Sequence, residues 1–145
     1  MTQLISREQI AAAAERLGPV VRRTPVIASR VLSERIGQQV YFKCEKNLQR
    51  TGSFKPRGAY NRIANLSRDE RERGVVAASA GNHAQGVAWA ATELGIASTV
   101  FMPVNVALPK LVATKAYGAQ VHLAGETIDD AWSLPASTPN TTEQS

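Results

Sequence analysis

The sequence has little that could cross-link the chain or anchor it in a membrane. Among its 145 residues there is one cysteine, Cys44, so an internal disulfide is excluded and a reducing compartment is expected. Apolar stretches such as Val75–Ala78 and Ile96–Val104 are far shorter than the about 20 apolar residues of a membrane helix. Met1–Glu8 is polar and mixed in charge, which does not predict a signal peptide. These shortages indicate a cytoplasmic globular protein without a membrane partner.

Charge is present, but it is distributed unevenly along the chain. Positions 1–73 carry 15 basic and 7 acidic side chains, whereas positions 74–145 carry 2 and 5. A basic half can bind nucleic acid or another acidic ligand. However, acidic residues interrupt the basic run at 68–73, and no aromatic residues are interleaved with it as they are in nucleic-acid-binding patches. The favoured interpretation is therefore a solvated, arginine-rich helical surface with no nucleic-acid partner.

The first half predicts short elements in no regular order. Ser6 and Gln9 have the spacing of a capping box before a helix. Turn residues and apolar spacing predict further helices at 29–36, from Pro56 to about Leu66 and at 68–73, and extended segments at 24–27 and 40–44.

From Val75 onward, predicted strands alternate with predicted helices. Strands are expected at 75–78, 97–102 and 120–123, and helices at 82–94 and 108–117. This alternation predicts a doubly wound parallel sheet of the α/β class. The pattern ends near Trp132, because positions 133–145 contain two prolines and one large apolar residue. Such a composition predicts a disordered tail.

The first segment that could carry chemistry follows the strand expected at 75–78. Residues 79–86 read Ser-Ala-Gly-Asn-His-Ala-Gln-Gly, a turn of small residues that leads into a helix. Open α/β sheets bind ligands at the carboxyl ends of their strands, and amides at a helix N-terminus attract anions. The segment fits neither the Walker loop nor the dinucleotide-binding fingerprint. An ordinary connection with Ser79 as the helix cap is the alternative interpretation.

The second segment places a lysine at the start of a helix. Residues 53–59 read Ser-Phe-Lys-Pro-Arg-Gly-Ala, with Lys55 just before the proline of the first turn. A cation is unfavourable at the positive end of a helix. Such a position suits a nucleophilic amine better than a structural charge. A lysine near a turn is nevertheless most often a solvated side chain, and the position alone favours that interpretation.

Other candidate residues have weaker support. His83 and His122 are the only histidines, and together with Cys44 they form no metal-ligand spacing. His122 lies in an alternating strand and is expected to be structural. Cys44 is expected to be a small buried hydrophobic residue rather than a nucleophile. Because Ser79 has no nucleophile elbow around it, a serine hydrolase is not expected.

Together, the segments 53–59 and 79–86 resemble those of the threonine dehydratase and serine racemase group. Members of this group are pyridoxal-phosphate enzymes of fold type II, the tryptophan synthase β type. The resemblance extends from about Ser6 to Trp132 and includes residues 110–121. It is strongest to threonine ammonia-lyase, a lyase of amino-acid metabolism that includes the enzyme of isoleucine biosynthesis.

The resemblance implies a role for each matching residue. Lys55 matches the lysine that forms the Schiff base with pyridoxal 5′-phosphate, and Asn82 matches the asparagine that hydrogen-bonds the 3′-oxygen of the cofactor. The loop that receives the substrate carboxylate is matched by Ser79, Ala80, Gly81 and His83. The implied reaction is β-elimination from L-threonine or L-serine, which yields a 2-oxo acid and ammonia.

The sequence also departs from that family. The glycine-rich loop that holds the cofactor phosphate and the group that faces the pyridine nitrogen have no counterpart here. We therefore expect residues 1–132 to be the truncated N-terminal part of the catalytic domain, inactive by itself, and 133–145 to be a tail foreign to the family. The resemblance implies homo-oligomers for the full-length enzymes. Two alternatives stay open: a non-catalytic binding or regulatory fragment that pairs with a full-length relative, and a relative of serine racemase or hydroxyaspartate dehydratase.

Overall fold

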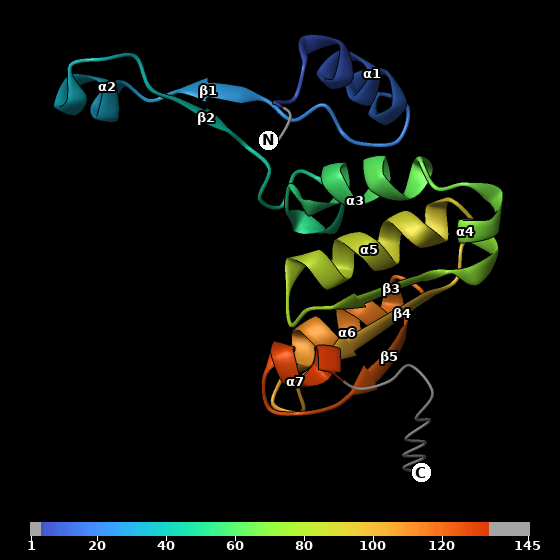
Figure 1. Ribbon diagram of the computed structural model, residues 1–145. Coiled ribbons are helices and arrows are strands. Elements are labelled where there is room, and N and C mark those ends of the chain that lie inside the picture. The colour runs from blue at the N-terminus through green and yellow to red at the C-terminus, as the bar shows by residue number, and fades with distance from the viewer. Residues whose placement is uncertain (1–3, 134–145) are drawn as a thin grey trace.

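The computed structural model describes residues 4–133, which form an α/β body with a protruding arm (Figure 1). Helices are α1 (Arg7–Leu17), α2 (Arg30–Ile36), α3 (Lys55–Ala64), α4 (Arg68–Arg73), α5 (Asn82–Glu93), α6 (Leu108–Ala116) and α7 (Ile128–Ser133), with a 3-10 turn, η1 (Arg50–Gly52). Strands are β1 (Val26–Ala28), β2 (Tyr41–Lys43), β3 (Val75–Ala78), β4 (Ser98–Met102) and β5 (Gln120–Leu123). Within 4–133, no helix is long and apolar enough to cross a membrane.

The body, residues 55–133, is built around a parallel sheet in the order β3-β4-β5. Val75 pairs with Ser98 at one strand pair, and Thr99 pairs with Gln120 at the other. Each strand returns through a helix, because parallel neighbours need a crossover connection. The predicted α/β fold with a parallel sheet is confirmed.

Helix α5 is the central element of the body. It contacts β3 and β4 on one side and α3 on the other, so it lies between the sheet and α3 (Figure 1). Eight of its residues are buried, and most of them are small. Small side chains allow the helix and the sheet to approach closely, which removes apolar surface from water. Val100 and Met102 of β4 pack against Ala84 and Ala88 in this interior.

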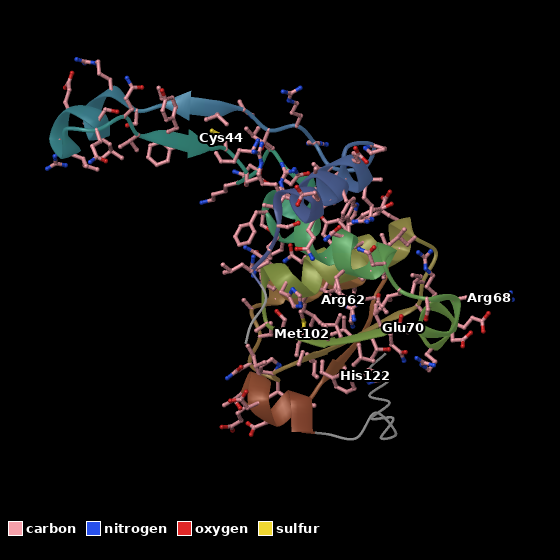
Figure 2. All side chains as sticks on the ribbon, turned by 45° about the horizontal axis from the view of Figure 1, so that its top comes forward. Cys44, Arg62, Arg68, Glu70, Met102 and His122 are labelled. Atoms are coloured by element: carbon pink, nitrogen blue, oxygen red, sulfur yellow. The ribbon has the colours of Figure 1, made fainter. Side chains whose placement is uncertain are left out.

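The arm, residues 26–43, consists of β1, α2 and β2. Its two strands pair antiparallel, with Val26 opposite Lys43, and α2 lies at the far end (Figure 1). Every residue of both strands is exposed. The sequence predicts the extended segments at 24–27 and 40–44. It does not predict their pairing, because a helix lies between them and no short turn connects them. Cys44 lies at the base of the arm (Figure 2) and is half-buried, so the expectation of a buried cysteine is wrong.

The N-terminal segment lies against the body. Helix α1 contacts α3, and Arg16 Nη1 donates a hydrogen bond to Asn61 Oδ1. From the family resemblance, Ile10, Leu17, Val20, Val26 and Leu32 are expected to lack apolar partners. Ile10 and Val26 are indeed exposed, but Val20 packs against the core around α3 and α5, so that expectation is wrong for it.

Caps predicted from the sequence determine where several helices begin. Ser6 with Gln9, and Ser67 with Glu70, form complete capping boxes at α1 and α4. Ser29 caps α2, and Gly37 ends it in the left-handed conformation at φ 73°. These local hydrogen bonds stabilise the ends of the helices without tertiary partners. The tail predicted from 133 onward lies outside the described residues, except for Ser133, which ends α7.

Candidate active site

Three helices begin close together at the carboxyl edge of the sheet. Strand β3 ends at Ala78, and the turn 79–81 leads into α5 at Asn82. Helix α3 begins at Lys55, whose backbone lies against Gly86 in the second turn of α5. Lys110 in the first turn of α6 reaches Asn82. The segments 53–59 and 79–86 are therefore neighbours in space, although the rest of α3, α4 and β3 separate them along the chain.

The turn at 79–81 is shaped by backbone hydrogen bonds. The Ser79 N–H donates to the Phe101 carbonyl at 3.0 Å, and the Ser79 hydroxyl accepts from the Gly81 N–H at 3.3 Å. Gly81 occupies the N-cap position of α5 and brings no side-chain cap. The alternative in which Ser79 caps the helix is therefore wrong. A Cβ atom at Gly81 would meet no described atom within 4 Å apart from its chain neighbours, so this side of the turn is open.

The helices of the site begin differently from the helices elsewhere. Serine side chains at the N-cap position cap α1, α2 and α4, whereas the N-cap residues of α3, α5 and α6 make no side-chain hydrogen bond to their helices. At α3, the Lys55 N–H donates instead to the Ser53 hydroxyl at 3.4 Å. The first turns of these three helices also lack acidic residues, and two of them carry a lysine, Lys55 or Lys110. The uncapped amides of α5 together with Lys55 and Lys110 give this edge a positive potential. Such an edge suits an anionic ligand.

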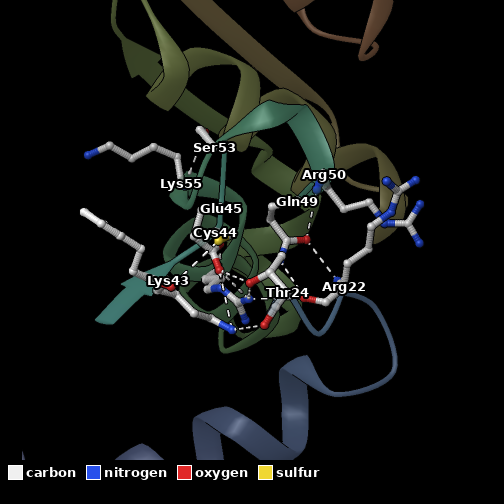
Figure 3. A network of polar contacts seen from close by, with 11 residues as sticks. Arg22, Thr24, Lys43, Cys44, Glu45, Gln49, Arg50, Ser53 and Lys55 are labelled. Atoms are coloured by element: carbon white, nitrogen blue, oxygen red, sulfur yellow. Dashed lines mark hydrogen bonds and ion pairs between the residues drawn. The ribbon is translucent and has the colours of Figure 1, made fainter. Parts of the chain in front are cut away.

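Lys55 is half-buried and lines a cavity of about 550 Å³. Its Nζ lies 5.0 Å from the centre of the Phe54 ring, and its side chain points away from Glu45 (Figure 3). The next residue, Pro56, is fully buried and anchors the first turn of α3. The amine is therefore accessible while the backbone that carries it is held in the core.

Gly86 sets the distance between α5 and this lysine. A Cβ atom at position 86 would lie 3.1 Å from both the carbonyl carbon and the Cβ of Lys55. Real Cβ atoms seldom lie so close to backbone, so any larger residue would push the two helices apart. The sequence pattern places this glycine at the end of the segment 79–86 and does not predict its contact with Lys55.

His83 lines the same cavity as Lys55. Partial burial, and then the positive charge of Lys55, lower the pKa of His83 below its ordinary value of 6.5. The imidazole is therefore neutral near pH 7, with one nitrogen free to accept a hydrogen bond and the other able to donate one.

Asn82 lines a second cavity of about 400 Å³, together with Lys110 and the loop that precedes α3. Lys110 Nζ donates a hydrogen bond to Asn82 Oδ1 at 2.9 Å. Sequence reasoning missed Lys110 as a site residue. The signal was the one that pointed to Lys55, namely a lysine in the first turn of a helix.

A polar network holds the loop before α3 (Figure 3). Arg57 donates to both carboxylate oxygens of Glu45, at 3.0 and 2.9 Å, and the Thr24 hydroxyl donates to the same carboxylate. The hydrogen bonds from Arg57 hold the pKa of Glu45 below its ordinary value. Gln49, only 3% exposed, donates to the Arg22 carbonyl and accepts from the Arg22 N–H. The arginine of the Lys-Pro-Arg-Gly motif thus anchors the helix that carries Lys55.

Not every candidate residue belongs to this site. Neither cavity is lined by Ser79, Ala80 or Gly81, which form the turn just before Asn82. His122 lies on β5, where its ring stacks on Phe101 at 5.3 Å between centres. This contact agrees with a structural role. Among residues 4–133, no three His, Cys, Asp or Glu side chains are grouped so that they could hold a metal ion.

Comparisons with known proteins identify the family of this chain. The model of the family described as pyridoxal-phosphate dependent enzyme matches residues 17–143. The L-threonine ammonia-lyase of Thermotoga maritima is 55% identical over 129 residues, which are 89% of this chain and 32% of that enzyme. An L-threo-3-hydroxyaspartate ammonia-lyase of a Pseudomonas species is 50% identical over 119 residues, 82% of this chain and 37% of that enzyme.

Solved structures with the same fold include relatives with different activities. Maize serine racemase has a TM-score of 0.79 and 37% identity, and the match covers 86% of this chain and 38% of that one. A threonine deaminase isoform from Solanum lycopersicum has a TM-score of 0.73 and 39% identity, over 88% of this chain and 36% of that one. The chain thus spans about a third of the length of the relatives that it matches.

Proposed function

Because this chain belongs to the pyridoxal-phosphate dependent enzyme family, we propose that it provides the lysine-bearing part of a threonine ammonia-lyase active site. The relatives named L-threonine ammonia-lyase support this reaction above the others. The observation that carries the proposal is the packing of α3 on α5. It brings Lys55, at the start of α3, against the helix whose uncapped N-terminus follows the turn 79–81.

The residues present fit pyridoxal phosphate. Lys55 offers an accessible amine for covalent attachment of the cofactor aldehyde. Asn82 offers an amide that can hydrogen-bond the 3′-oxygen, and the uncapped amides of α5 can bind an anion. When bound, the cofactor supplies an electron sink for the bond that breaks at the Cα of an amino acid.

The proposed reaction is β-elimination from L-threonine or L-serine. Lys55 Nζ holds the cofactor and, once released from it, takes the proton from the substrate Cα. The turn of Ser79, Ala80 and Gly81 receives the substrate carboxylate, and neutral His83 adds a hydrogen bond there. The β-hydroxyl then leaves as water, and hydrolysis of the enamine that results gives a 2-oxo acid and ammonia.

Within 1–145 there is no glycine-rich loop to hold the cofactor phosphate. Charge-assisted hydrogen bonds contribute about 1.5–3 kcal/mol each. Without three of them, binding is weaker by over ~4 kcal/mol, roughly a thousandfold. We therefore expect the purified chain to bind the cofactor weakly and to release little 2-oxo acid from threonine.

A second function, binding to a longer relative without catalysis, is favoured by the arm. Apolar side chains of the arm, such as Ile27, Val31 and Phe42, are half or more exposed, which suits a surface that another polypeptide covers. Gel filtration of the chain mixed with a full-length threonine ammonia-lyase separates the two functions. Co-elution without any gain in turnover favours the binding function.

Reductive labelling tests the assignment of Lys55. The chain is mixed with pyridoxal phosphate, reduced with borohydride and digested, and the labelled peptides are mapped by mass spectrometry. We expect the label on Lys55 well above that on the other four lysines, and its loss in Lys55→Met. Exposed Lys115 serves as the internal reference. Equal labelling of Lys55 and Lys115 would contradict the proposal.

A further inference from the structure

We infer that Lys110 is a positioning residue that fixes the side-chain amide of Asn82, so that its NH2 group, rather than its oxygen, is presented to the site. This inference rests on the proposed function for its biological meaning, but the contact itself is independent of any cofactor. It adds a residue on α6 to a site otherwise formed by α3 and α5.

The chemistry of the two side chains determines the orientation. An asparagine amide has one oxygen that accepts and one NH2 group that donates, whereas a lysine ammonium can only donate. The Lys110 ammonium lies 2.9 Å from Asn82 Oδ1, so the oxygen is the atom that faces the lysine. A flipped amide would place two donors against each other. The NH2 group is therefore the atom left for a ligand.

Lys110 is held in place by its own helix. Its backbone N–H donates to the Ala107 carbonyl at 2.9 Å, and its carbonyl accepts from the Thr114 hydroxyl at 2.8 Å. Thr114 is completely buried, and α6 packs against α5. A lysine in the first turn of a helix is unfavourable for the helix itself. Its hydrogen bond across to Asn82 offsets this unfavourable position and connects the first turns of the two helices.

The orientation matters for a ligand with an anionic oxygen. The 3′-oxygen of pyridoxal phosphate accepts hydrogen bonds when it is ionised, so it is attracted to an NH2 group and repelled by an amide oxygen. If Lys110 is absent, the amide is free to turn over, and either end can face the ligand. Removing Lys110 should therefore weaken the hydrogen bond between Asn82 and the ligand oxygen, although Lys110 does not itself make that hydrogen bond.

Side-chain amide NMR of the ligand-free chain tests the contact directly. With asparagine labelled with ¹⁵N, the Asn82 NH2 signals are assigned by their loss in Asn82→Asp. We expect Lys110→Met to shift these signals and Lys110→Arg to restore them in part, because arginine also donates. Lys115→Met removes a charge from the same helix and should leave them unchanged. Unchanged Asn82 signals in Lys110→Met would overturn the inference.

Cofactor binding provides the second measurement. The concentration of pyridoxal phosphate that half-saturates reductive labelling of Lys55 should rise about tenfold in Lys110→Met, the effect of one lost hydrogen bond to a charged group. This concentration should rise less in Lys110→Arg and should not change in Lys115→Met. If Lys55 is labelled normally and Lys110→Met behaves like Lys115→Met, the inference fails while the proposed function stands. If the wild-type chain shows no preference for Lys55, the proposed function fails, and the NMR comparison alone decides the inference.

Discussion

The arm and the body both contain regular helices and strands, but they differ in how far the side chains of these elements are buried. In the arm, α2 is capped by Ser29 and closed by Gly37, and its strands pair in register. In the body, Val100 of β4 is completely buried, whereas Val26 of β1 is 60% exposed. Both valines lie in strands with similar local sequence signals. Hydrogen bonding within an element is therefore not what distinguishes the two regions.

The difference shows where stability comes from. A two-stranded ribbon without a covered face is marginal in water, because its hydrogen bonds replace equivalent bonds to water. Burial of apolar side chains is what offsets the entropy of the ordered chain. The body has such burial on α5 and β4, and within the described residues the arm does not. The residues of the candidate active site belong to the covered region.

Hydrogen exchange should show the largest contrast. We expect amides in β3, α5 and β4 to exchange at least about a thousandfold more slowly than those in β1 and β2, since only the former need cooperative unfolding to exchange. Exchange measured by mass spectrometry on peptides from 26–43 and 75–102 gives both rates in one sample. Equal protection of the two regions would show that the arm is covered in solution, for example by self-association.

Truncation of matched valines should sharpen the contrast. Val100→Ala removes two fully buried methyl groups and should lower the free energy of unfolding by about 2–3 kcal/mol. Val26→Ala in the arm should change it by less than about 0.5 kcal/mol. Urea denaturation of both variants provides the comparison. Similar losses for the two would mean that Val26 has a partner in solution.

The Glu45–Arg57 pair joins the loop that follows the arm to the body and should have an intermediate effect. Arg57→Met leaves the mostly buried Glu45 carboxylate without its main donors. It should lower the free energy of unfolding by roughly 2 kcal/mol. Arg68→Met breaks a pair in which both side chains are exposed and should cost under about 0.5 kcal/mol.

The Glu45–Arg57 pair should also make the free energy of unfolding depend on pH in the acidic range. Because folding lowers the pKa of Glu45, its contribution is present above the ordinary carboxylate pKa and is lost as pH falls through the lowered one. Arg57→Met should therefore lose less stability on acidification than the wild type. Denaturation curves recorded from neutral to acidic pH test this, and identical slopes for both proteins would contradict the assigned cause.

Two glycines test how tightly the site is packed within the body. Gly86→Ala places a Cβ atom against the Lys55 backbone and should cost about 1–2 kcal/mol, with less labelling of Lys55. Gly58→Ala, on α3, meets no described atom and should be neutral or stabilise by up to about 1 kcal/mol, because alanine favours the helix. A stable Gly86→Ala variant with normal labelling would show that the contact does not position the lysine.

The smallest effect should be the titration of His83. Its pKa lies below the ordinary value, so the unfolded chain binds the proton more readily, and stability decreases as pH falls below about 6.5. Lys55→Met removes a positive charge and should raise the pKa of His83, whereas Lys115→Met should not. Proton NMR of the imidazole gives both values. An unchanged His83 titration in Lys55→Met would rule out the electrostatic coupling.

Much of the local structure could be predicted because its causes lie within a few residues. The two capping boxes each join positions three apart, and the alternation of strands and helices from Val75 reflects periodic burial. The segments that contain Lys55 and Asn82 could be recognised from their residue order alone. Their roles on the cofactor stay predictions, because only labelling and binding measurements test them.

The sequence by itself determined where helices begin, which strands are apolar and to which family the motifs belong. Only the tertiary structure decided that Gly86 packs on Lys55, that Arg57 pairs with Glu45 across 12 residues, and that Lys110 reaches Asn82 across 28. Such contacts depend on the packing of α3, α5 and α6, and no local pattern specifies that packing. The arm illustrates the same limit. Its helix caps and extended segments could be predicted from local sequence, but local sequence does not show what, if anything, packs on its exposed strands.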